Sequence, residues 1–248
     1  MTVVALHGFT GSGADFDVLS HRLSVPLVAP DLLGHGDAPD PAEPRAYRMS
    51  AQVRRIAADL DDGPVVLLGY SLGGRVALRL WPLLRDRLRG MVLIGAHPGL
   101  IDPVERAERM AADHALAGQI EEQGMGWFLD HWAQQPIIRS QAAIPPEILK
   151  PMRERRRRNR TLGLANSLRG AGQGAADPVW EQLSDIPAPC LVISGAADRK
   201  YGEVSGAMVE AMSHARHTVI PDAGHCAHLE NLDATCAILS EFLAEVSE

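Results

Sequence analysis

Six short apolar runs recur along the 248 residues, separated by amphipathic or loop-like stretches. Each run is five or six residues long and rich in valine, leucine or isoleucine, which is typical of strands buried on both faces. The runs are TVVAL (2–6), PLVAP (26–30), PVVLLG (64–69), MVLIGA (91–96), CLVISG (190–195) and HTVIP (217–221). Because helical patterns separate successive runs, the chain is predicted to be α/β, with a mostly parallel sheet flanked by helices.

The alternation of strands and helices stops in the middle of the chain. Residues 98–186 have a mostly helical pattern with no clear strand. We therefore expect a core formed by residues 1–97 and 187–248, with residues 98–186 as a helical cap over the sheet. The cap contains RERRRRNR (153–160), whose six arginines are interpreted as a solvated helix face with one arginine at most in a functional role.

Composition excludes several classes of function. The net charge of −7 argues against nucleic acid as a partner, because such binding depends on neutralising phosphates. No apolar run reaches the 18 residues expected of a membrane span. The three cysteines have no C-x-x-C spacing, which favours a reducing, cytoplasmic setting. The sequence does not predict an oligomeric state.

A candidate nucleophile follows the third apolar run. GYSLG (69–73) fits the G-x-S-x-G pattern in which a sharp strand-to-helix turn exposes a serine, here Ser71. A serine hydroxyl needs an imidazole to activate it and an acid to orient that imidazole. His225 follows the last predicted strand, and Asp198 follows the strand before it. The order Ser71, Asp198, His225 is the one used by this strand–turn–helix type of triad, so these residues are predicted to be catalytic.

Negative charge that develops on a substrate oxygen needs preorganised donors. The backbone N–H of Leu72, at the start of the predicted helix, is one candidate. The N–H of Phe9, in the glycine-rich loop HGFTGSG (7–13), is the other. A metal site formed by His225, His228 and Glu230 is the less favoured interpretation of this region, because the triad accounts for His225. We expect neither a metal nor a cofactor.

Nine stretches along almost the whole chain carry a family resemblance. They are LHGFTGSG (6–13), APDLLGHG (29–36), GYSLGGRVAL (69–78), GAHPGL (95–100), ERAER (105–109), HWAQQP (131–136), LANSLRGAGQG (164–174), GAADRKY (195–201) and AGHCAHLEN (223–231). Together they resemble the α/β-hydrolase superfamily, and within it the 2-succinyl-6-hydroxy-2,4-cyclohexadiene-1-carboxylate synthases of menaquinone biosynthesis. The first, second and last stretches occur in many α/β-hydrolases, whereas GYSLGGR, HPGL, ERAER and SLRGAGQG are closer to the synthases.

The resemblance implies a lyase without a cofactor. In these synthases the serine–histidine pair removes a proton, and the resulting anion expels pyruvate from a substrate with three carboxylates. It implies that Ser71 and His225 form the base, that Asp198 orients His225, and that Phe9 and Leu72 supply the oxyanion N–H groups. The substrate-binding residues that it implies are Arg75, Arg109, Arg156, Tyr70, Trp132 and Lys200, with Arg156 assigned within one or two positions.

Two other functions fit parts of the same pattern. An acyl hydrolase acting on a small acidic ester or thioester would use the same triad and oxyanion donors. A non-catalytic receptor is disfavoured, because all three triad members are present. For single residues, Arg75 could instead form a structural ion pair, and Trp132 could belong to the core of the cap.

Overall fold

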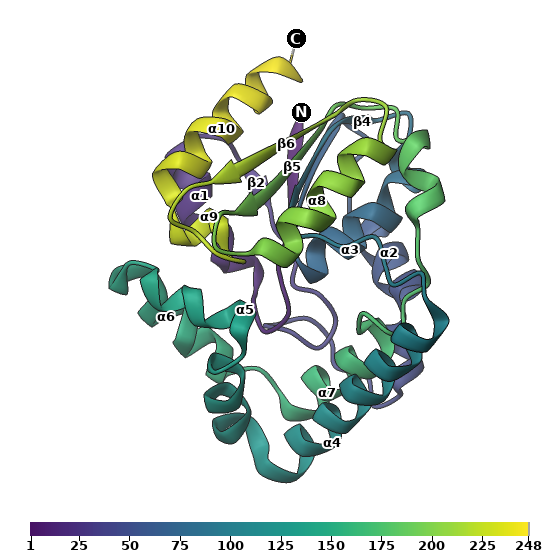
Figure 1. Ribbon diagram of the computed structural model, residues 1–248, viewed down its shortest axis with the longest axis vertical. Helices are drawn as coiled ribbons and strands as arrows, with labels where there is room; N and C mark the ends of the chain where they lie inside the picture. The colour runs from purple at the N-terminus through teal and green to yellow at the C-terminus, as the bar shows by residue number, and fades with distance from the viewer. Residues whose placement is uncertain (248) are drawn as a thin grey trace.

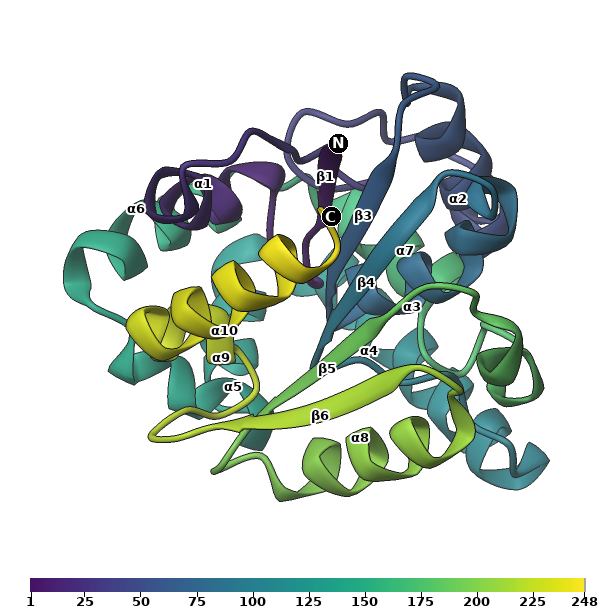
Figure 2. The same ribbon diagram turned by 90° about the horizontal axis from the view of Figure 1, so that it is seen from above.

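A computed structural model describes residues 1–247 of the chain. Within them, six strands form one sheet in the order β2-β1-β3-β4-β5-β6, and every neighbouring pair is parallel (Figure 2). The strands are β1 (Thr2–Leu6), β2 (Leu27–Val28), β3 (Val65–Tyr70), β4 (Leu88–Ile94), β5 (Cys190–Gly195) and β6 (Ala215–Ile220). Each predicted run therefore overlaps one strand. β2 is short because Pro26 and Pro30, which have no N–H to donate to a ladder, flank it.

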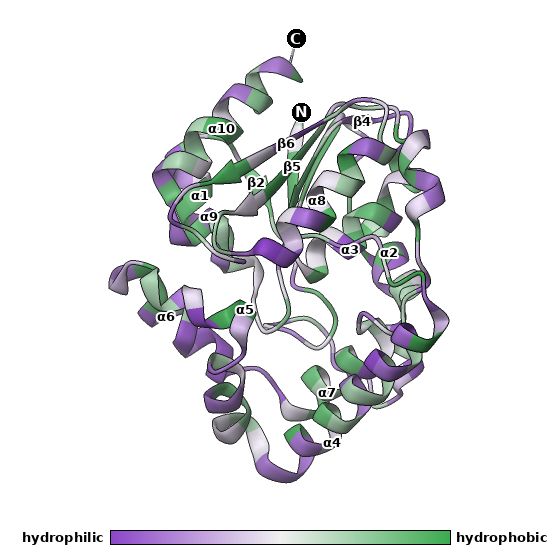
Figure 3. Ribbon diagram, in the orientation of Figure 1, coloured by the Kyte–Doolittle hydropathy of each residue, from purple (hydrophilic) through white to green (hydrophobic). Residues whose placement is uncertain are grey.

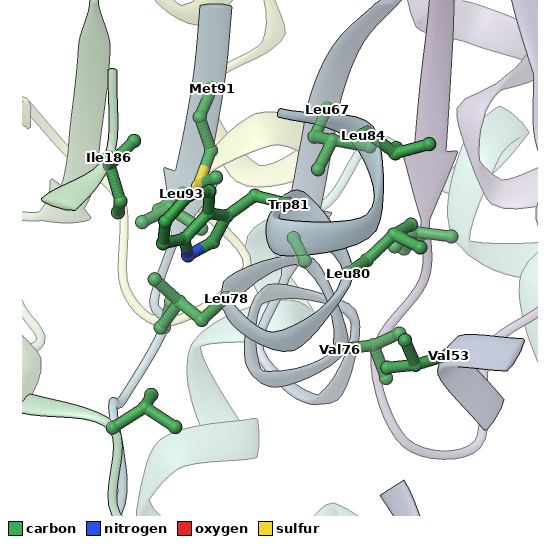
Figure 4. Close-up of a cluster of buried hydrophobic side chains, with 14 of the residues drawn as sticks. Val53, Leu67, Val76, Leu78, Leu80, Trp81, Leu84, Met91, Leu93 and Ile186 are labelled. Atoms are coloured by element: carbon green, nitrogen blue, oxygen red, sulfur yellow. The ribbon is translucent and has the colours of Figure 1, made fainter. Parts of the chain in front are cut away.

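Helices cover both faces of the sheet (Figures 1 and 2). On one face lie α2 (Met49–Ala58), α3 (Leu72–Leu80) and α8 (Arg199–Ala211). On the other lie α1 (Asp17–Leu23) and α10 (Leu232–Glu245). Figure 4 shows the first core, where Trp81 and Leu78 pack against Met91 and Leu93 of β4. Alternate strand residues enter the two cores, as expected for a sheet that is buried on both sides.

Shorter elements adjoin two of the helices. α3 ends at Leu80, because Pro82 cannot donate the next helical hydrogen bond. α9 (Ala227–Glu230) comes directly before α10, and the Asn231 side chain caps α10 by accepting from Ala234 N. The 3₁₀ turns are η1 (Gly13–Phe16), η2 (Pro44–Tyr47), η3 (Trp81–Leu84), η4 (Ser140–Ala143) and η5 (Trp180–Asp185).

The helical insertion lies beyond the carboxyl ends of the strands, in the lower half of Figure 1. It contains α4 (Pro103–Ala133), α5 (Pro136–Arg139), α6 (Pro146–Arg157) and α7 (Thr161–Ala171). α4 packs along α7 around a small core that includes Ile120, Phe128 and Leu164. Even the 31-residue α4 is not apolar enough to cross a membrane, and no other helix in residues 1–247 is both long and apolar enough. The borders of this cap at 97/98 and 186/187 stay a prediction.

Candidate active site

Ser71 occupies the sharp turn between β3 and α3. Its φ of 50° and ψ of −105° lie in a region that non-glycine residues rarely adopt, so the surrounding structure must hold the strain. The flanking glycines make the turn possible. A Cβ on Gly69 would lie 2.6 Å from the carbonyl oxygen of Gly73, and one on Gly73 would overlap the carbonyl oxygen of Leu6. The turn places the serine at the carboxyl edge of the sheet, facing the cap.

The three predicted triad residues lie together in hydrogen-bonding order. The Ser71 hydroxyl donates to Nε2 of His225 at 3.0 Å, and Nδ1 of His225 donates to Oδ2 of Asp198 at 2.7 Å. His225 is 3% exposed and Asp198 8%, so water competes little for these contacts. The bond to Asp198 keeps the proton on Nδ1 and leaves Nε2 free to accept one from Ser71.

Asp198 also caps the helix that follows it. Its Oδ1 accepts from Tyr201 N at 3.3 Å, at the start of α8, while its Oδ2 holds His225. Asp198 can cap the helix and hold His225 at the same time, because each contact uses a different carboxylate oxygen. This capping hydrogen bond fixes the plane of the Asp198 carboxylate, and the carboxylate in turn fixes the plane of the His225 imidazole.

Two backbone N–H groups beside Ser71 are available as oxyanion donors. Phe9 and Leu72 line the same cavity as Ser71. Within residues 1–247, neither N–H donates to another protein group. Leu72 is the first residue of α3, where the helix dipole favours negative charge. The role of both N–H groups as oxyanion donors stays a prediction.

Arg75 lies one turn of α3 after Ser71 and lines the cavity beside it. Its Nη1 donates to the carbonyl oxygen of Ala171 in the cap at 2.9 Å. No carboxylate in residues 1–247 lies within 4.0 Å of its guanidinium, so the structure shows no ion pair for it. Desolvation lowers the pKa of Arg75 to about 10, and the charge of Arg109 adds to the effect. The side chain is a cation that a bound anion would stabilise.

A second arginine reaches the cavity from the cap. Arg109, on α4, donates from Nε to Oδ1 of Asp113 at 2.8 Å and from Nη1 to Oε1 of Gln173 at 3.1 Å. Asp113 is only 3% exposed, and the contact with Arg109 offsets the desolvation penalty of its buried carboxylate. These two contacts leave Nη2 of the guanidinium without an assigned partner. Arg75 and Arg109 therefore make this end of the cavity positive.

The remaining predicted residues divide into two pairs. Tyr70 and Trp132 line the Ser71 cavity, whereas Arg156 and Lys200 do not. Arg156 lies behind the cavity wall, where its Nη1 donates to Oε1 of Gln141 at 2.8 Å. Lys200 is exposed on the first turn of α8, and its charge helps to lower the pKa of His97. The roles of both residues stay predictions.

Sequence reasoning missed several residues of the cavity. His97 is buried there, and desolvation together with the charges of Lys200, Arg75, Arg109 and Arg79 lowers its pKa to about 4. The ring of Tyr201 lies 4.3 Å from that of His225, centroid to centroid. The other missed lining residues are Gly95, Ile137, Gln141, Ser167, Leu168, Ala171, Gly172 and Gln173. Most come from the cap, where no spacing rule marks a side chain as facing the cavity.

The metal interpretation of His225, His228 and Glu230 finds no support in the described residues. No group of three or more His, Cys, Asp or Glu side chains in residues 1–247 is placed to hold a metal ion. Glu230 instead accepts from the backbone N–H groups of Gly224 and Cys226 and from Ser140. His228 packs between the rings of Phe16 and Tyr70. Both residues support the loop that carries His225.

Comparison with known proteins agrees with this architecture, since residues 3–238 match the alpha/beta hydrolase family. The chain belongs to that family. One relative in it, the putative 2-succinyl-6-hydroxy-2,4-cyclohexadiene-1-carboxylate synthase of Bacillus subtilis (strain 168), is 35% identical over 98% of this chain and 90% of its own length. The synthase of that name from Serratia proteamaculans (strain 568) is 30% identical over 97% and 92%.

A solved structure of MenH from S. aureus superposes on this alpha/beta hydrolase family member with a TM-score of 0.93. The two chains are 25% identical, and the match covers 100% of this chain and 95% of the other. The likeness therefore includes the cap as well as the sheet. It confirms the predicted α/β-hydrolase fold with a helical insertion.

Proposed function

We propose that this protein is a 2-succinyl-6-hydroxy-2,4-cyclohexadiene-1-carboxylate synthase. It would eliminate pyruvate from 2-succinyl-5-enolpyruvyl-6-hydroxy-3-cyclohexene-1-carboxylate, a step of menaquinone biosynthesis. The names of the relatives from Bacillus subtilis and Serratia proteamaculans, each matched over nearly the whole chain, support this assignment. The enzyme would be a cytoplasmic carbon–oxygen lyase that uses no cofactor, and its partner would be a small tricarboxylate.

The observation that carries the proposal is the cation beside the serine. Arg75 lines the Ser71 cavity with no carboxylate partner in residues 1–247, and Arg109 lines it from the opposite side of the cap–core boundary. Guanidinium groups recognise carboxylates through paired N–H donors. A hydrolase of neutral esters would gain nothing from two arginines here. A substrate with three carboxylates would use both of them.

The proposed reaction needs a base and an electrostatic site. His225, held by Asp198, takes the Ser71 proton as the serine oxygen takes a proton from the ring carbon of the substrate. The electron pair left on that carbon forms one new ring double bond. The pair of the existing ring double bond shifts to the carbon that carries the enolpyruvyl group, and the C–O bond at that carbon breaks. The departing pyruvate enolate takes the proton held by His225 and becomes pyruvate, which returns His225 to its neutral form. The N–H groups of Phe9 and Leu72 would stabilise the charge on a substrate oxygen while the carbanion exists.

Pyruvate release tests the proposal. The triacid is generated in place by the enzyme of the preceding step, and pyruvate is followed with a coupled lactate dehydrogenase. We expect rapid release that falls at least about 10³-fold in Ser71→Ala, since the serine is a member of the proposed base. The control is Ser213→Ala, which removes an exposed hydroxyl whose only hydrogen bond within residues 1–247 is to Ser184 O.

The rival function predicts a different result in the same preparation. An acyl hydrolase would leave the triacid unchanged and turn over small acidic aryl esters or thioesters. Absence of pyruvate together with efficient hydrolysis of mono-p-nitrophenyl succinate would overturn the lyase and establish the hydrolase. Equal pyruvate release by Ser71→Ala would reject the assigned base.

A further inference from the structure

A second cavity adjoins the Ser71 cavity inside the cap. It has a volume of about 280 Å³ and lies between the carboxyl end of α4, the short α5, and α6. Trp132, Ile138 and Gln141 line both cavities, so their side chains form the wall between the two. We call this second cavity the arginine vestibule. Its lining also includes Asp130 and four arginines, Arg139, Arg153, Arg156 and Arg157.

The arginine vestibule is strongly positive in a protein that is negative overall. Its lining includes four arginines and one carboxylate, that of Asp130, whereas the whole chain has a net charge of −7. None of these arginines lies within 4.0 Å of a carboxylate in residues 1–247. Arg153 and Arg157 are exposed on α6, the helix at the left of Figure 3, which contains both hydrophilic and hydrophobic segments. Three of the six arginines in the run 153–160 therefore line one opening.

The Ser71 cavity is too small for the proposed triacid as it stands. Its volume is about 70 Å³, whereas sites for ligands of that size usually exceed about 300 Å³. Binding therefore requires part of the cavity wall to move. The wall shared with the vestibule consists of side chains on the short elements α5 and η4 and the end of α4. Movement of this wall would enlarge the Ser71 cavity into the arginine vestibule.

Few polar contacts hold the side chains of that wall, so the wall can act as a movable barrier. Trp132 Nε1 is buried without a hydrogen-bond partner in residues 1–247, so no polar contact fixes the indole. Gln141 is held by one side chain, Arg156, whose guanidinium faces the vestibule. An arriving carboxylate can compete with Gln141 for Arg156, since a charged acceptor makes a stronger bond than a neutral amide. Displacement of Gln141 would join the two cavities.

We infer that the arginine vestibule is the entrance for the anionic substrate, and that Arg153 and Arg157 steer it toward the barrier of Trp132, Ile138 and Gln141. This inference rests on the proposed function for the charge of the ligand. Clefts lined by one sign of charge raise association rates by about tenfold or more, and salt screens the effect. The distinctive consequence is a rate of association that depends on these exposed arginines.

Association is measured with Ser71→Ala, which binds the triacid without turning it over, by stopped-flow tryptophan fluorescence. At about 0.01 M salt, where the screening length is about 30 Å, Arg153→Gln/Arg157→Gln should associate about tenfold more slowly than the parent. At about 1 M salt the two rates should converge. The matched control is Arg45→Gln/Arg54→Gln, which removes two exposed arginines from a groove that shares no lining residue with the vestibule.

A steric test does not depend on charge. Ala142 is exposed and lines the vestibule, whereas its neighbour Ala143 is exposed and does not. Ala142→Trp should slow association at every salt concentration, and Ala143→Trp should leave it unchanged. Rapid association in both Ala142→Trp and Arg153→Gln/Arg157→Gln would contradict the proposal that the arginine vestibule is the entrance. Pyruvate release by the unmodified enzyme is measured alongside, so a failure of the proposed function is seen separately.

Discussion

Asn159, between α6 and α7 of the cap, donates from Nδ2 to the carbonyl oxygen of Thr10, 2.8 Å away in the loop that carries Phe9. Thr10 has a φ of 72°, an outlier for a β-branched residue, and such strain costs about 1–3 kcal/mol. Oδ1 of Asn159 accepts from Gly36 N at 2.9 Å. One buried cap residue thus holds two core loops, including the loop with a proposed oxyanion donor.

Removing that amide should therefore affect turnover as well as stability. In Asn159→Ala, Thr10 can relax and the N–H of Phe9 can leave its position. We expect kcat for pyruvate release to fall about tenfold or more, equivalent to about 1.4 kcal/mol, with a smaller change in KM. The free energy of unfolding should fall by about 2 kcal/mol, since two buried hydrogen bonds are lost. Steady-state kinetics and urea unfolding measure the two effects.

The chain offers a matched control for this variant. Asn166 is also a buried cap residue, and its Nδ2 donates to Ala42 O at 3.0 Å in a core segment away from Phe9. Asn166→Ala should lose stability to a similar degree and keep kcat. A parallel loss of kcat in both variants would show that general loosening of the cap, rather than the Thr10 contact, explains the result.

Arg75 should contribute to substrate binding. Arg75→Gln removes the charge while keeping a donor for Ala171 O, and we expect kcat/KM for the triacid to fall about tenfold to a hundredfold. Arg75→Lys should recover part of the loss, because it restores charge without the planar pair of donors. Arg79→Gln is the control, since Arg79 lies one turn further along α3 and does not line the Ser71 cavity. Unchanged kinetics in Arg75→Gln would contradict carboxylate binding at this position.

Asp113 should act through Arg109. Its only assigned hydrogen bond in the described residues is the one from Arg109 Nε, and it is too deeply buried to meet substrate directly. Asp113→Asn keeps an acceptor, so we expect KM to rise only slightly. Asp113→Leu removes the acceptor, and KM should rise about as much as in Arg109→Gln. KM of the double variant Asp113→Leu/Arg109→Gln should be little higher than that of either single variant, and a double-mutant cycle measures this coupling. Additive effects of the two substitutions on KM would show that Asp113 does not act through Arg109.

The part of the site that follows strands was predictable from the chain. Ser71, Asp198 and His225 each lie in the turn or loop that follows an apolar run, and parallel strands bring their carboxyl ends to one edge of the sheet. Glycine spacing around Ser71 adds a steric signature, because side chains at Gly69 or Gly73 would collide with backbone. Local pattern and sheet topology together therefore specify the triad arrangement.

The cap side of the site could not be predicted in the same way. Gln141 and Ser167 face the cavity because of how α5, η4 and α7 pack on the core, and no residue spacing encodes that packing. Arg156 shows the limit most clearly. The sequence marked the arginine run as dense, yet only the fold shows that Arg155 pairs with Asp15 at 2.7 Å while its neighbour Arg156 turns toward Gln141. Adjacent identical residues differ in role only through tertiary contacts.

Buried histidines should make the fold sensitive to acid. Burial lowers the pKa of His228 to about 3, with the nearby His225 adding to the effect. An unfolded histidine titrates near 6.5, so the unfolded state binds more protons than the folded state between about pH 6.5 and pH 3. Stability from this group is therefore complete above about pH 6.5 and is lost as the pH falls. His35, whose pKa burial also lowers to about 3, acts in the same direction.

His228→Phe should reduce this acid sensitivity. A phenyl ring can keep the packing between Phe16 and Tyr70, while the titrating group is removed. When the pH falls from about 7 to about 5.5, the free energy of unfolding should decrease in both proteins, but by about 1 kcal/mol less in the variant than in the parent. The reason is that the variant lacks the histidine that takes up a proton on unfolding. Urea unfolding at the two pH values measures the difference, with His21→Phe, on an exposed helix position, as the matched control. An equal loss of stability in His228→Phe and the parent would show that the imidazole becomes protonated inside the fold at little cost.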